Sequence, residues 1–208
     1  MPLSAAEVAH LKKTPDSDGV SPVALNRWSP RAFADQDVSP TDLKTIFEAA
    51  RWAASSSNEQ PWRFLVGRRN SSTYQKIFST LVPFNQGWAQ AAPVLILGAA
   101  KNTLTLHHQR PNAHALHDLG AADATLALEA ARLGLSTHFM GGFDKDAARA
   151  AFAIPEDFSL GAVIALGYQG DPATLSNAEL IELEVAPRTR KPLSEIVFSA
   201  WDLPADLG

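Results

Sequence analysis

The sequence has no cysteine, and this absence removes several kinds of chemistry. Disulfide bridges, thiolate metal sites and cysteine nucleophiles are all excluded in a chain of 208 residues without a single thiol. The lack of cysteine is compatible with a reducing compartment, and we predict a cytoplasmic protein. Its length and its 46% of hydrophobic residues suffice for one globular domain with a core.

Long apolar runs and an excess of positive charge are also missing. No stretch approaches the roughly 20 apolar residues that a membrane-spanning helix needs. Residues 1–10 include Glu7 and lack the apolar centre of a signal peptide. The net charge of -4 argues against a nucleic-acid partner, because phosphate backbones are bound by basic surfaces. We therefore expect neither membrane nor nucleic acid among the partners.

Several common nucleotide-binding and hydrolase motifs are absent. The chain contains no G-x-G-x-x-G loop, no G-x-x-x-x-G-K-[ST] loop and no G-x-S-x-G nucleophile elbow. Glu179, Glu182 and Glu184 are close in sequence, and we interpret them as a solvated edge and not as an acid–base pair. The sequence thus predicts no catalytic acid, base or nucleophile.

Apolar residues recur at helical spacing in some segments and run continuously in others. The best helix start is Ser-Pro-Thr-Asp at residues 39–42, which combines an N-cap, a proline at the first position and an acidic residue. Helices are predicted at residues 5–13, from 21 onward, from 40 to about 54, and at 71–81, 84–90, 114–133 and 144–152. Strands are predicted at residues 62–66, 94–100, 136–140 and 160–166.

The order of these elements indicates the fold class. Helices alternate with strands but without a regular βαβ rhythm, which favours an α/β or α+β fold around one central sheet. The helix at 114–133 is apolar on nearly every side and ends at Gly134, so it is either a central core helix or part of a subunit interface. Residues 1–19 are interpreted as a loosely held N-terminal arm, and residues 20–208 as one domain.

Four polar elements remain after the core is assigned. The loop at residues 55–60 has more hydroxyls and amides than a turn requires, which suits a flat and largely uncharged ligand. Arginines within residues 27–31 and 188–190 are suited to phosphate, and Gly141-Gly142 allows a ligand to approach the backbone closely. Each element alone is equally compatible with an ordinary polar surface. Together they suit a phosphorylated flat cofactor.

Histidines are concentrated in one segment. His107, His108, His114 and His117 lie close together, and the last two have a spacing that can bind a metal. The alternative, a polar loop that leads into a helix, explains the same residues more simply, and we predict no metal site. His138 is expected in the pocket or the core near Met140.

These elements resemble the nitroreductase-like family of FMN-dependent oxidoreductases from about residue 20 to the C-terminus. The family pattern Arg-x-Ser-x-Arg-x-Phe corresponds to Arg-Trp-Ser-Pro-Arg-Ala-Phe at residues 27–33. The family's helix, followed by a Ser-rich loop and Asn-x-Gln-Pro-Trp, corresponds to residues 50–62. Its glycine turn corresponds to Met-Gly-Gly-Phe at residues 140–143, and its late basic pair corresponds to residues 188–190. Each motif is weak alone, but four in this order and spacing are specific.

The resemblance implies which residues bind the phosphate end of FMN. Arg27, Arg188 and Arg190 would hold the phosphate itself. Trp28 and Ser29 would contact the ribityl-phosphate end.

The resemblance also implies contacts to the flavin ring. Arg31 would lie near the pyrimidine edge. The turn at Met140, Gly141 and Gly142 would bring a backbone N–H near flavin N5, and Asn85 matches a position that binds the flavin edge. Backbone groups would lie along the ring and the ribityl chain at Ser55, Ser56, Ser57 and Asn58.

Two positions depart from the family pattern. Ala54 stands where many relatives have proline, so the loop that follows is expected to be less rigid. Gly141 stands where the best-studied branch of the family has a glutamate, so the substrate preferences of that branch do not carry over.

The resemblance implies an α+β fold with a mixed central sheet flanked by helices, in an intertwined homodimer with FMN at the subunit interface. Hydride would pass from NADH or NADPH to flavin N5, and then to an electron-poor small molecule such as a nitroaromatic or a quinone. Two alternatives remain. One is a flavin enzyme of the same fold that performs dehalogenation, enone reduction or flavin fragmentation, and the other is a non-catalytic flavin-binding protein.

Overall fold

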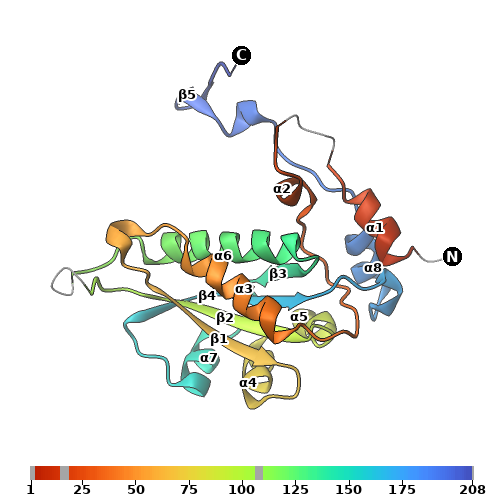
Figure 1. The fold of residues 1–208 in the computed structure, drawn as a ribbon, viewed down its shortest axis with the longest axis horizontal. Coiled ribbons are helices and arrows are strands. Elements are labelled where there is room, and N and C mark those ends of the chain that lie inside the picture. The colour runs from red at the N-terminus through yellow and green to blue at the C-terminus, as the bar shows by residue number, and fades with distance from the viewer. Residues whose placement is uncertain (1–2, 15–18, 106–109, 208) are drawn as a thin grey trace.

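A four-stranded sheet forms the centre of the computed structural model, which describes residues 3–14, 19–105 and 110–207 (Figure 1). The strands are β1 (Trp62–Arg68), β2 (Val94–Lys101), β3 (Ser136–Met140) and β4 (Phe158–Gly167). They lie in the order β1-β2-β4-β3, and every neighbouring pair is antiparallel. The α+β class is confirmed. The sheet of a single chain is, however, antiparallel in its described strands and not mixed as expected.

The strand β2 is the most deeply buried strand, as its continuous apolar run predicts. All of its residues except Lys101 are buried. Its side chains alternate between the two faces of the sheet: Leu95 and Leu97 belong to one hydrophobic cluster, and Ile96 belongs to the other. The sheet therefore separates two cores, and each core needs a layer of helices to cover it.

Helices supply these two layers (Figure 1). One face is covered by α3 (Pro40–Arg51) and α6 (Ala115–Arg132), and the other by α4 (Ser72–Thr80), α5 (Pro83–Ala89) and α7 (Lys145–Phe152). The predicted start of α3 is confirmed, because the Ser39 hydroxyl accepts the N–H of Asp42 at 3.0 Å. The helix ends at Arg51, and a short 3-10 turn, η1 (Ser56–Asn58), follows in the Ser-rich loop.

The long helix α6 lies against the sheet on one side only. Leu119 and Leu126 are buried in the core beneath it, whereas Leu116 is 51% exposed and Leu128 is 40% exposed. Gly134 adopts a φ of +77° just after the helix, which confirms its predicted role as the terminating glycine. The helix is thus a core helix that also presents apolar side chains outward.

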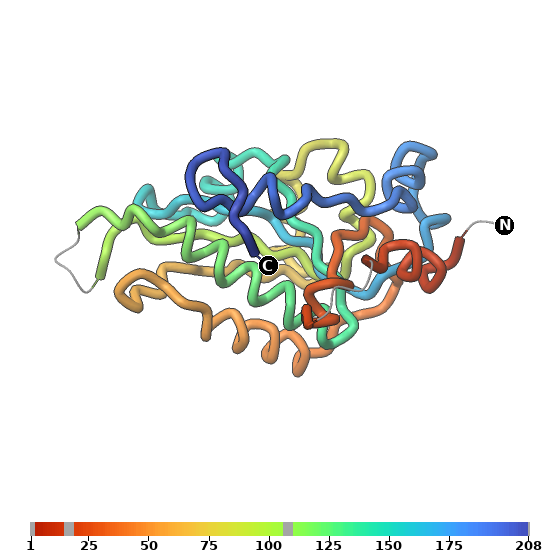
Figure 2. The backbone as a smooth tube through the Cα atoms, turned by 90° about the horizontal axis from the view of Figure 1, so that it is seen from above, coloured from red at the N-terminus to blue at the C-terminus, as the bar shows by residue number. Residues whose placement is uncertain are grey.

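The first α-helix of the chain lies beside the last one (Figure 2). The helix α1 (Ala5–Leu11) packs on α8 (Ala178–Val185), Val8 is fully buried, and the Gln169 side chain donates a hydrogen bond to the Ala5 carbonyl at 3.0 Å. The helix α1 is therefore anchored, whereas this part of the chain was expected to be loosely held. The short helix α2 (Pro22–Asn26) begins after Ser21 as predicted, although the Ser21 side chain makes no capping hydrogen bond.

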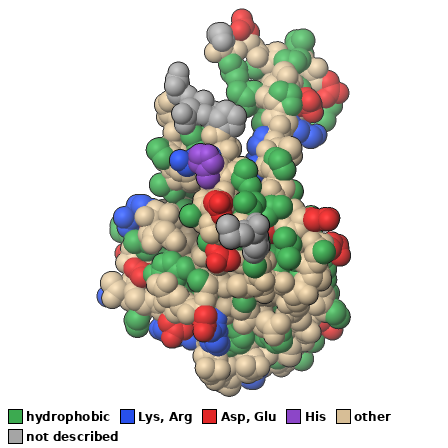
Figure 3. Space-filling model, turned by 90° about the vertical axis from the view of Figure 1, so that its right-hand side faces the viewer, with side chains coloured by type: hydrophobic (Ala, Val, Ile, Leu, Met, Phe, Trp, Pro, Cys, Tyr) green, Lys and Arg blue, Asp and Glu red, His purple; other side chains and the backbone are tan. Residues whose placement is uncertain are grey.

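The last residues project away from the sheet (Figures 1 and 3). They contain η3 (Leu193–Glu195) and a small hairpin of β5 (Phe198–Ala200) and β6 (Leu203–Pro204), while η2 (Pro172–Thr174) precedes α8. Residues 187–192 adopt neither helix nor strand, as their prolines predict. Several large apolar side chains of this projecting segment are exposed: Leu193, Ile196, Trp201, Leu203 and Leu207. Across the described ranges, no helix is long and apolar enough to cross a bilayer.

A glycine in β1 provides a direct test of the packing between the sheet and α4. A Cβ atom at Gly67 would overlap the backbone of Tyr74, so Gly67→Ala should destabilise the protein by about 1–3 kcal/mol. Gly87 in α5 is the matched control, because a Cβ there meets no atom within 4 Å. Gly87→Ala should be neutral or stabilising by up to about 1 kcal/mol. Urea unfolding measures both, and equal stabilities of the two variants would contradict the packing.

Candidate cofactor site

The predicted phosphate-binding arginines lie together in one chain. Burial lowers the pKa of Arg27, and the nearby charge of Arg190 lowers it further. Burial likewise lowers the pKa of Arg188, with smaller contributions from the charges of Arg190 and Arg27. No carboxylate forms an ion pair with any of the three among the residues that the structure describes. A cluster of like charges of this kind is suited to an anion.

Backbone carbonyls hold Arg188 in this cluster. Its Nη1 donates to the carbonyls of Lys12, at 2.9 Å, and Leu25, at 2.6 Å. The guanidinium of Arg27 reaches the Ser29 hydroxyl at 3.5 Å, a weak contact. Arg190 donates only to the carbonyl of its neighbour Thr189 within the described part of the chain. Most of their hydrogen-bonding capacity therefore remains for a ligand.

Arg31 occupies the next position along the same segment. Its Nε is buried, and no group in the described ranges accepts a hydrogen bond from it. Its guanidinium lies 6.0 Å from the ring centre of Phe84. Buried donors are nearly always satisfied, so an orphaned guanidinium nitrogen at this position indicates a missing acceptor. A flavin pyrimidine edge, with its carbonyl oxygens and ring nitrogens, has suitable acceptors.

His138, on β3, supports the segment that carries Arg31. Its Nδ1 lies 3.0 Å from the Pro30 carbonyl, and its ring centre lies 4.5 Å from that of Trp88. Burial, assisted by the charge of Arg31, lowers the pKa of His138 to about 4, against the opposing hydrogen bonds from the Pro30 and Ser29 backbone. The imidazole is therefore neutral at physiological pH, with its proton assigned to Nδ1 as donor to Pro30. Its predicted place near Met140 is confirmed, because both belong to β3.

The glycine turn follows β3. Met140 is buried, and Gly141 is exposed with open space around it. The Gly142 carbonyl accepts the Asn85 side-chain amide at 3.0 Å and the Val82 N–H at 3.1 Å. A Cβ at Gly142 would lie 2.9 Å from the Asn85 amide nitrogen, so the glycine permits this close packing. The structure thus brings Asn85 and Gly142 together, and the Asn85 amide fixes the turn.

The Ser-rich loop has an unusual backbone. Ser57, Asn58 and Gln60 have φ values of +53°, +53° and +50°, a left-handed region that is uncommon for residues other than glycine. The Ser55 hydroxyl accepts the Gln60 N–H at 3.0 Å, and the buried Asp118 carboxylate accepts the Ser56 N–H at 3.0 Å. Such conformations persist where surrounding contacts enforce them, and they are concentrated at functional sites.

The Ser-rich loop and the arginine cluster lie at opposite ends of α6. Asp118, which binds the loop, is in the first turn of the helix, whereas Arg132 in the last turn lines a cavity shared with Arg27. Fourteen residues of helix separate Asp118 from Arg132, which corresponds to about 21 Å. A five-carbon ribityl chain is too short to bridge this distance. A single chain therefore does not bring all of the predicted cofactor residues together.

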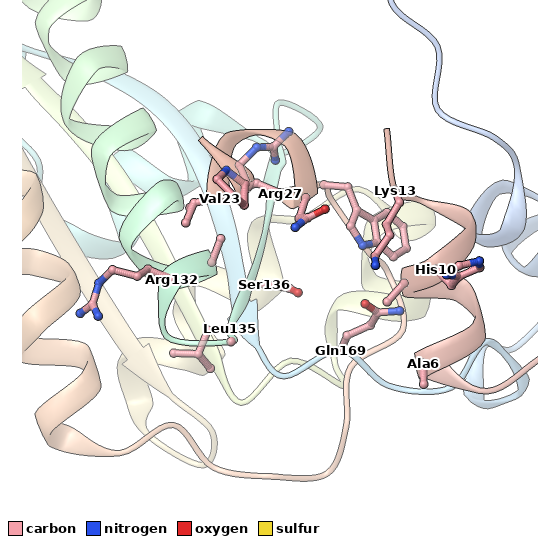
Figure 4. A pocket seen from close by; sticks show the side chains of 15 residues that line it. Ala6, His10, Lys13, Val23, Arg27, Arg132, Leu135, Ser136 and Gln169 are labelled. Carbon is pink, nitrogen blue, oxygen red and sulfur yellow. The ribbon is translucent and has the colours of Figure 1, made fainter. Parts of the chain in front are cut away.

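A cavity of about 630 Å³ adjoins the arginine cluster (Figure 4). It lies between α1, α2 and the end of α6, and the described residues that line it include basic side chains but no carboxylate. In Figure 4, the side chains of Ser136 and Gln169 lie near its centre and that of Arg132 points away. The lining residues with charged or polar side chains are His10, Lys13, Asn26, Arg27, Arg132, Ser136 and Gln169.

Sequence reasoning missed two buried acids. Glu184 was expected on a solvated edge, but it is fully buried and accepts the backbone N–H groups of Arg31 and Ala32. The spacing carried the signal: Leu180 and Glu184 are four residues apart, which places them on the same face of α8. Asp118, which holds the Ser-rich loop, was also missed and adjoins the weighed histidine segment.

The histidine segment is only partly described. His107 and His108 lie outside the described residues. The rings of His114 and His117 are 6.4 Å apart, and the His117 Nδ1 lies 3.1 Å from the Asp118 carboxylate. In the part of the chain that the structure covers, no three metal-ligating side chains are placed to hold an ion.

Comparisons with known proteins give a consistent result. Residues 24–168 match the nitroreductase family. A solved structure described as an oxidoreductase containing FMN superimposes with a TM-score of 0.83 at 36% identity, covering 90% of this chain and 94% of that one. An uncharacterised protein of Mycolicibacterium smegmatis is 37% identical over 68% of this chain and 99% of its own length. A provisionally named NADH dehydrogenase/NAD(P)H nitroreductase of Archaeoglobus fulgidus is 29% identical, over 74% and 87%.

The depressed pKa of His138 predicts an acid-sensitive stability. The pKa falls from 6.5 in the unfolded chain to about 4 in the folded one, so the unfolded state binds more protons between these values. The contribution of His138 to the free energy of unfolding is therefore complete above pH 6.5 and is lost as pH drops towards 4. Between pH 7 and pH 4.5, His138 should contribute a loss of about 2 kcal/mol.

Urea unfolding of His138→Asn at both pH values measures this contribution, because asparagine keeps a donor for Pro30 but cannot titrate. The variant should lose less stability than the wild type on acidification. His10→Asn, at an exposed position, is the control and should retain the wild-type pH dependence. An unchanged acid sensitivity of His138→Asn would contradict the assignment.

Proposed function

The chain belongs to the nitroreductase family, and from this premise we propose that it is an FMN-dependent oxidoreductase that uses NADH or NADPH. The observation that carries the proposal is the cluster of Arg27, Arg188 and Arg190, which has no carboxylate partner among the described residues. Four residues after Arg27, the buried Nε of Arg31 has no acceptor among them either. An anionic group with a flat, acceptor-rich ring satisfies both features. The predicted cytoplasmic location remains part of this proposal.

The residues of this chain fit the two ends of FMN. Arg27, Arg188 and Arg190 would hold the phosphate, since guanidinium groups bind phosphate oxygens through paired hydrogen bonds. Trp28 and Ser29 would contact the ribityl-phosphate end, next to Arg27. Arg31 would donate to the pyrimidine edge of the ring through its free Nε.

FMN, when bound, supplies a ring that accepts and returns hydride at N5. Arg31 would hold a fixed positive charge beside the N1–C2=O edge, where negative charge develops on reduction. The Gly142 turn, fixed by Val82 and Asn85, would present backbone N–H groups near N5. Met140 and Gly141 complete this turn. None of these roles requires a catalytic acid or base from the protein.

We further propose an electron-poor small molecule as the acceptor, such as a nitroaromatic or a quinone. The family match and the exposed, unobstructed Gly141 support it, because an acceptor must reach the flavin after the nicotinamide leaves. In the assay below, flavin binding without catalysis would give no bleaching. Dehalogenation, enone reduction or flavin fragmentation would give no turnover of nitroaromatics or quinones.

The separation of the two half-sites supports a homodimer. The Ser-rich loop of Ser55, Ser56, Ser57 and Asn58 is bound by Asp118, about 21 Å along α6 from Arg132 in the wall of the cavity that Arg27 also lines. A second copy of the chain would therefore supply this loop to each cofactor. The outward side of α6 exposes Leu116 and Leu128, and the projecting C-terminal segment exposes Trp201 at 90%. Apolar surface of this kind on two separate elements is typical of a subunit interface.

The cofactor assignment predicts a specific effect of Arg188. Purified wild-type protein should be yellow, bind FMN saturably and lose its flavin absorbance when NADH or NADPH is added. Arg188→Gln should weaken FMN binding by about tenfold or more, because one charged hydrogen-bonding partner of the phosphate is lost. Arg132→Gln is the matched control, since Arg132 lies near the same cavity but is paired with Glu129.

Fluorescence titration with FMN and single-turnover absorbance measure these outcomes. A wild-type protein without saturable FMN affinity would refute the proposal. A yellow protein whose flavin absorbance is unchanged by NADH and NADPH would support flavin binding but refute the reductase activity. A steady-state screen of nitroaromatics and quinones with both nicotinamides then identifies the acceptor class.

The shared site predicts complementation between two defective chains. Ser57→Pro should destroy the Ser-rich loop, because proline cannot adopt the φ of +53° found there. When Ser57→Pro and Arg188→Gln chains are co-expressed with different tags, the purified heterodimer should regain about one tight FMN site per dimer. Each homodimer should lack tight sites. A heterodimer without tight FMN binding would contradict the shared site, because then each site would be complete within one chain.

A further inference from the structure

Two helices outside the family match meet beneath the segment that carries Arg31. The match covers residues 24–168, whereas α1 and α8 lie before and after it. Lys12, just after α1, is only 4% exposed, and Glu184 in α8 is fully buried. Buried ionisable residues are rare and are normally paired or hydrogen-bonded, so this pair requires an explanation.

Glu184 binds the backbone on which Arg31 is mounted. Its Oε1 accepts the N–H groups of Arg31 at 3.1 Å and Ala32 at 3.0 Å, and its Oε2 accepts the Arg31 N–H at 2.9 Å. Together with His138, which binds the Pro30 carbonyl, this carboxylate holds the segment at three successive residues. The side chain of Arg31 is therefore attached to a backbone segment that cannot rotate freely.

Lys12 acts on the same carboxylate through its charge and contacts the phosphate end of the site directly. Its ammonium donates to the Ala186 carbonyl and lies 4.6 Å from the ring centre of Trp28. Its carbonyl accepts the guanidinium of Arg188 at 2.9 Å. Burial raises the pKa of Glu184. The hydrogen bonds from the Arg31 and Ala32 N–H groups and the charges of Arg31 and Lys12 oppose this increase.

We propose that Glu184 is a positioning residue for the cofactor site, which fixes the backbone of Arg31 and offsets part of the Arg31 charge. This inference rests on the proposed function, because it assigns Arg31 to the flavin. Both oxygens of Glu184 accept hydrogen bonds, which is the behaviour of a carboxylate. Glutamine at this position would direct an amide N–H₂ at one backbone donor and would remove the offsetting charge.

The inference predicts a change in flavin energetics and not only in stability. Glu184→Gln should shift the flavin midpoint potential to a more positive value, because the charge of Arg31 is then less offset and favours the reduced, more negative ring. Glu184→Ala should also weaken FMN binding by about tenfold, because the Arg31 segment loses its anchors. Glu182→Gln on the same helix removes an equal charge from an exposed position and should leave both quantities at wild-type values.

A double-variant cycle tests whether Glu184 acts through Arg31. In an Arg31→Gln background, Glu184→Gln should no longer shift the potential. An equal shift in both backgrounds would overturn the proposed route. Wild-type affinity and potential in Glu184→Gln, with only a lower melting temperature, would show a purely structural role and overturn the inference while the proposed function stands. If the wild-type protein does not bind FMN, the proposed function fails and this inference fails with it.

Discussion

Three guanidinium groups lie together with no carboxylate partner among the residues that the structure describes, and the rest of the site depends on this constraint. Arg27, Arg188 and Arg190 repel one another, and burial of Arg27 and Arg188 adds a desolvation cost. The fold tolerates this because Arg188 is bound by two backbone carbonyls from the N-terminal region. An anion that enters the cluster removes the repulsion. The repulsion in the unliganded cluster therefore favours the binding of a phosphate.

The helix α6 determines how the remaining site residues are distributed. It fixes the Ser-rich loop at its first turn through Asp118 and ends beside the cavity that Arg27 lines. Since its length exceeds the reach of one cofactor, pairing of two chains around α6 is the simplest way to complete a site. Exposed Leu116 and Leu128 on the same helix are consistent with such pairing. In the proposed homodimer, this one helix would support the core, space the two predicted half-sites and contribute to the interface.

The sequence was sufficient wherever a structural signal is local. The serine cap of α3, the glycine after α6 and the continuous apolar run of β2 depend on neighbouring residues, and the structure confirms all three. The motif residues around Arg27 and Gly142 also lie close together, through the contacts of His138 and Asn85. Which of them bind a cofactor stays a prediction, because no contact within a single chain decides it.

Features that depend on distant residues were not predictable in the same way. The burial of Glu184 arises from contacts with Arg31 and Ala32, more than 150 residues away in sequence. The anchoring of α1 depends on α8 at the other end of the chain. Strand direction in the sheet follows from the connections between β1, β2 and β4, which apolar patterning alone does not encode. Local charge pattern suggested a solvated acid at Glu184, and tertiary contacts reversed that expectation.

The long separation between Glu184 and the segment that it anchors has a consequence during biosynthesis. Ala32 leaves the ribosome 152 residues before its carboxylate partner does. When the last strand of the sheet is completed at Gly167, the growing chain still has neither Glu184 nor Arg188 to hold the N-terminal motif. If the site binds FMN as proposed, loading of the cofactor would follow synthesis of the nearly complete polypeptide.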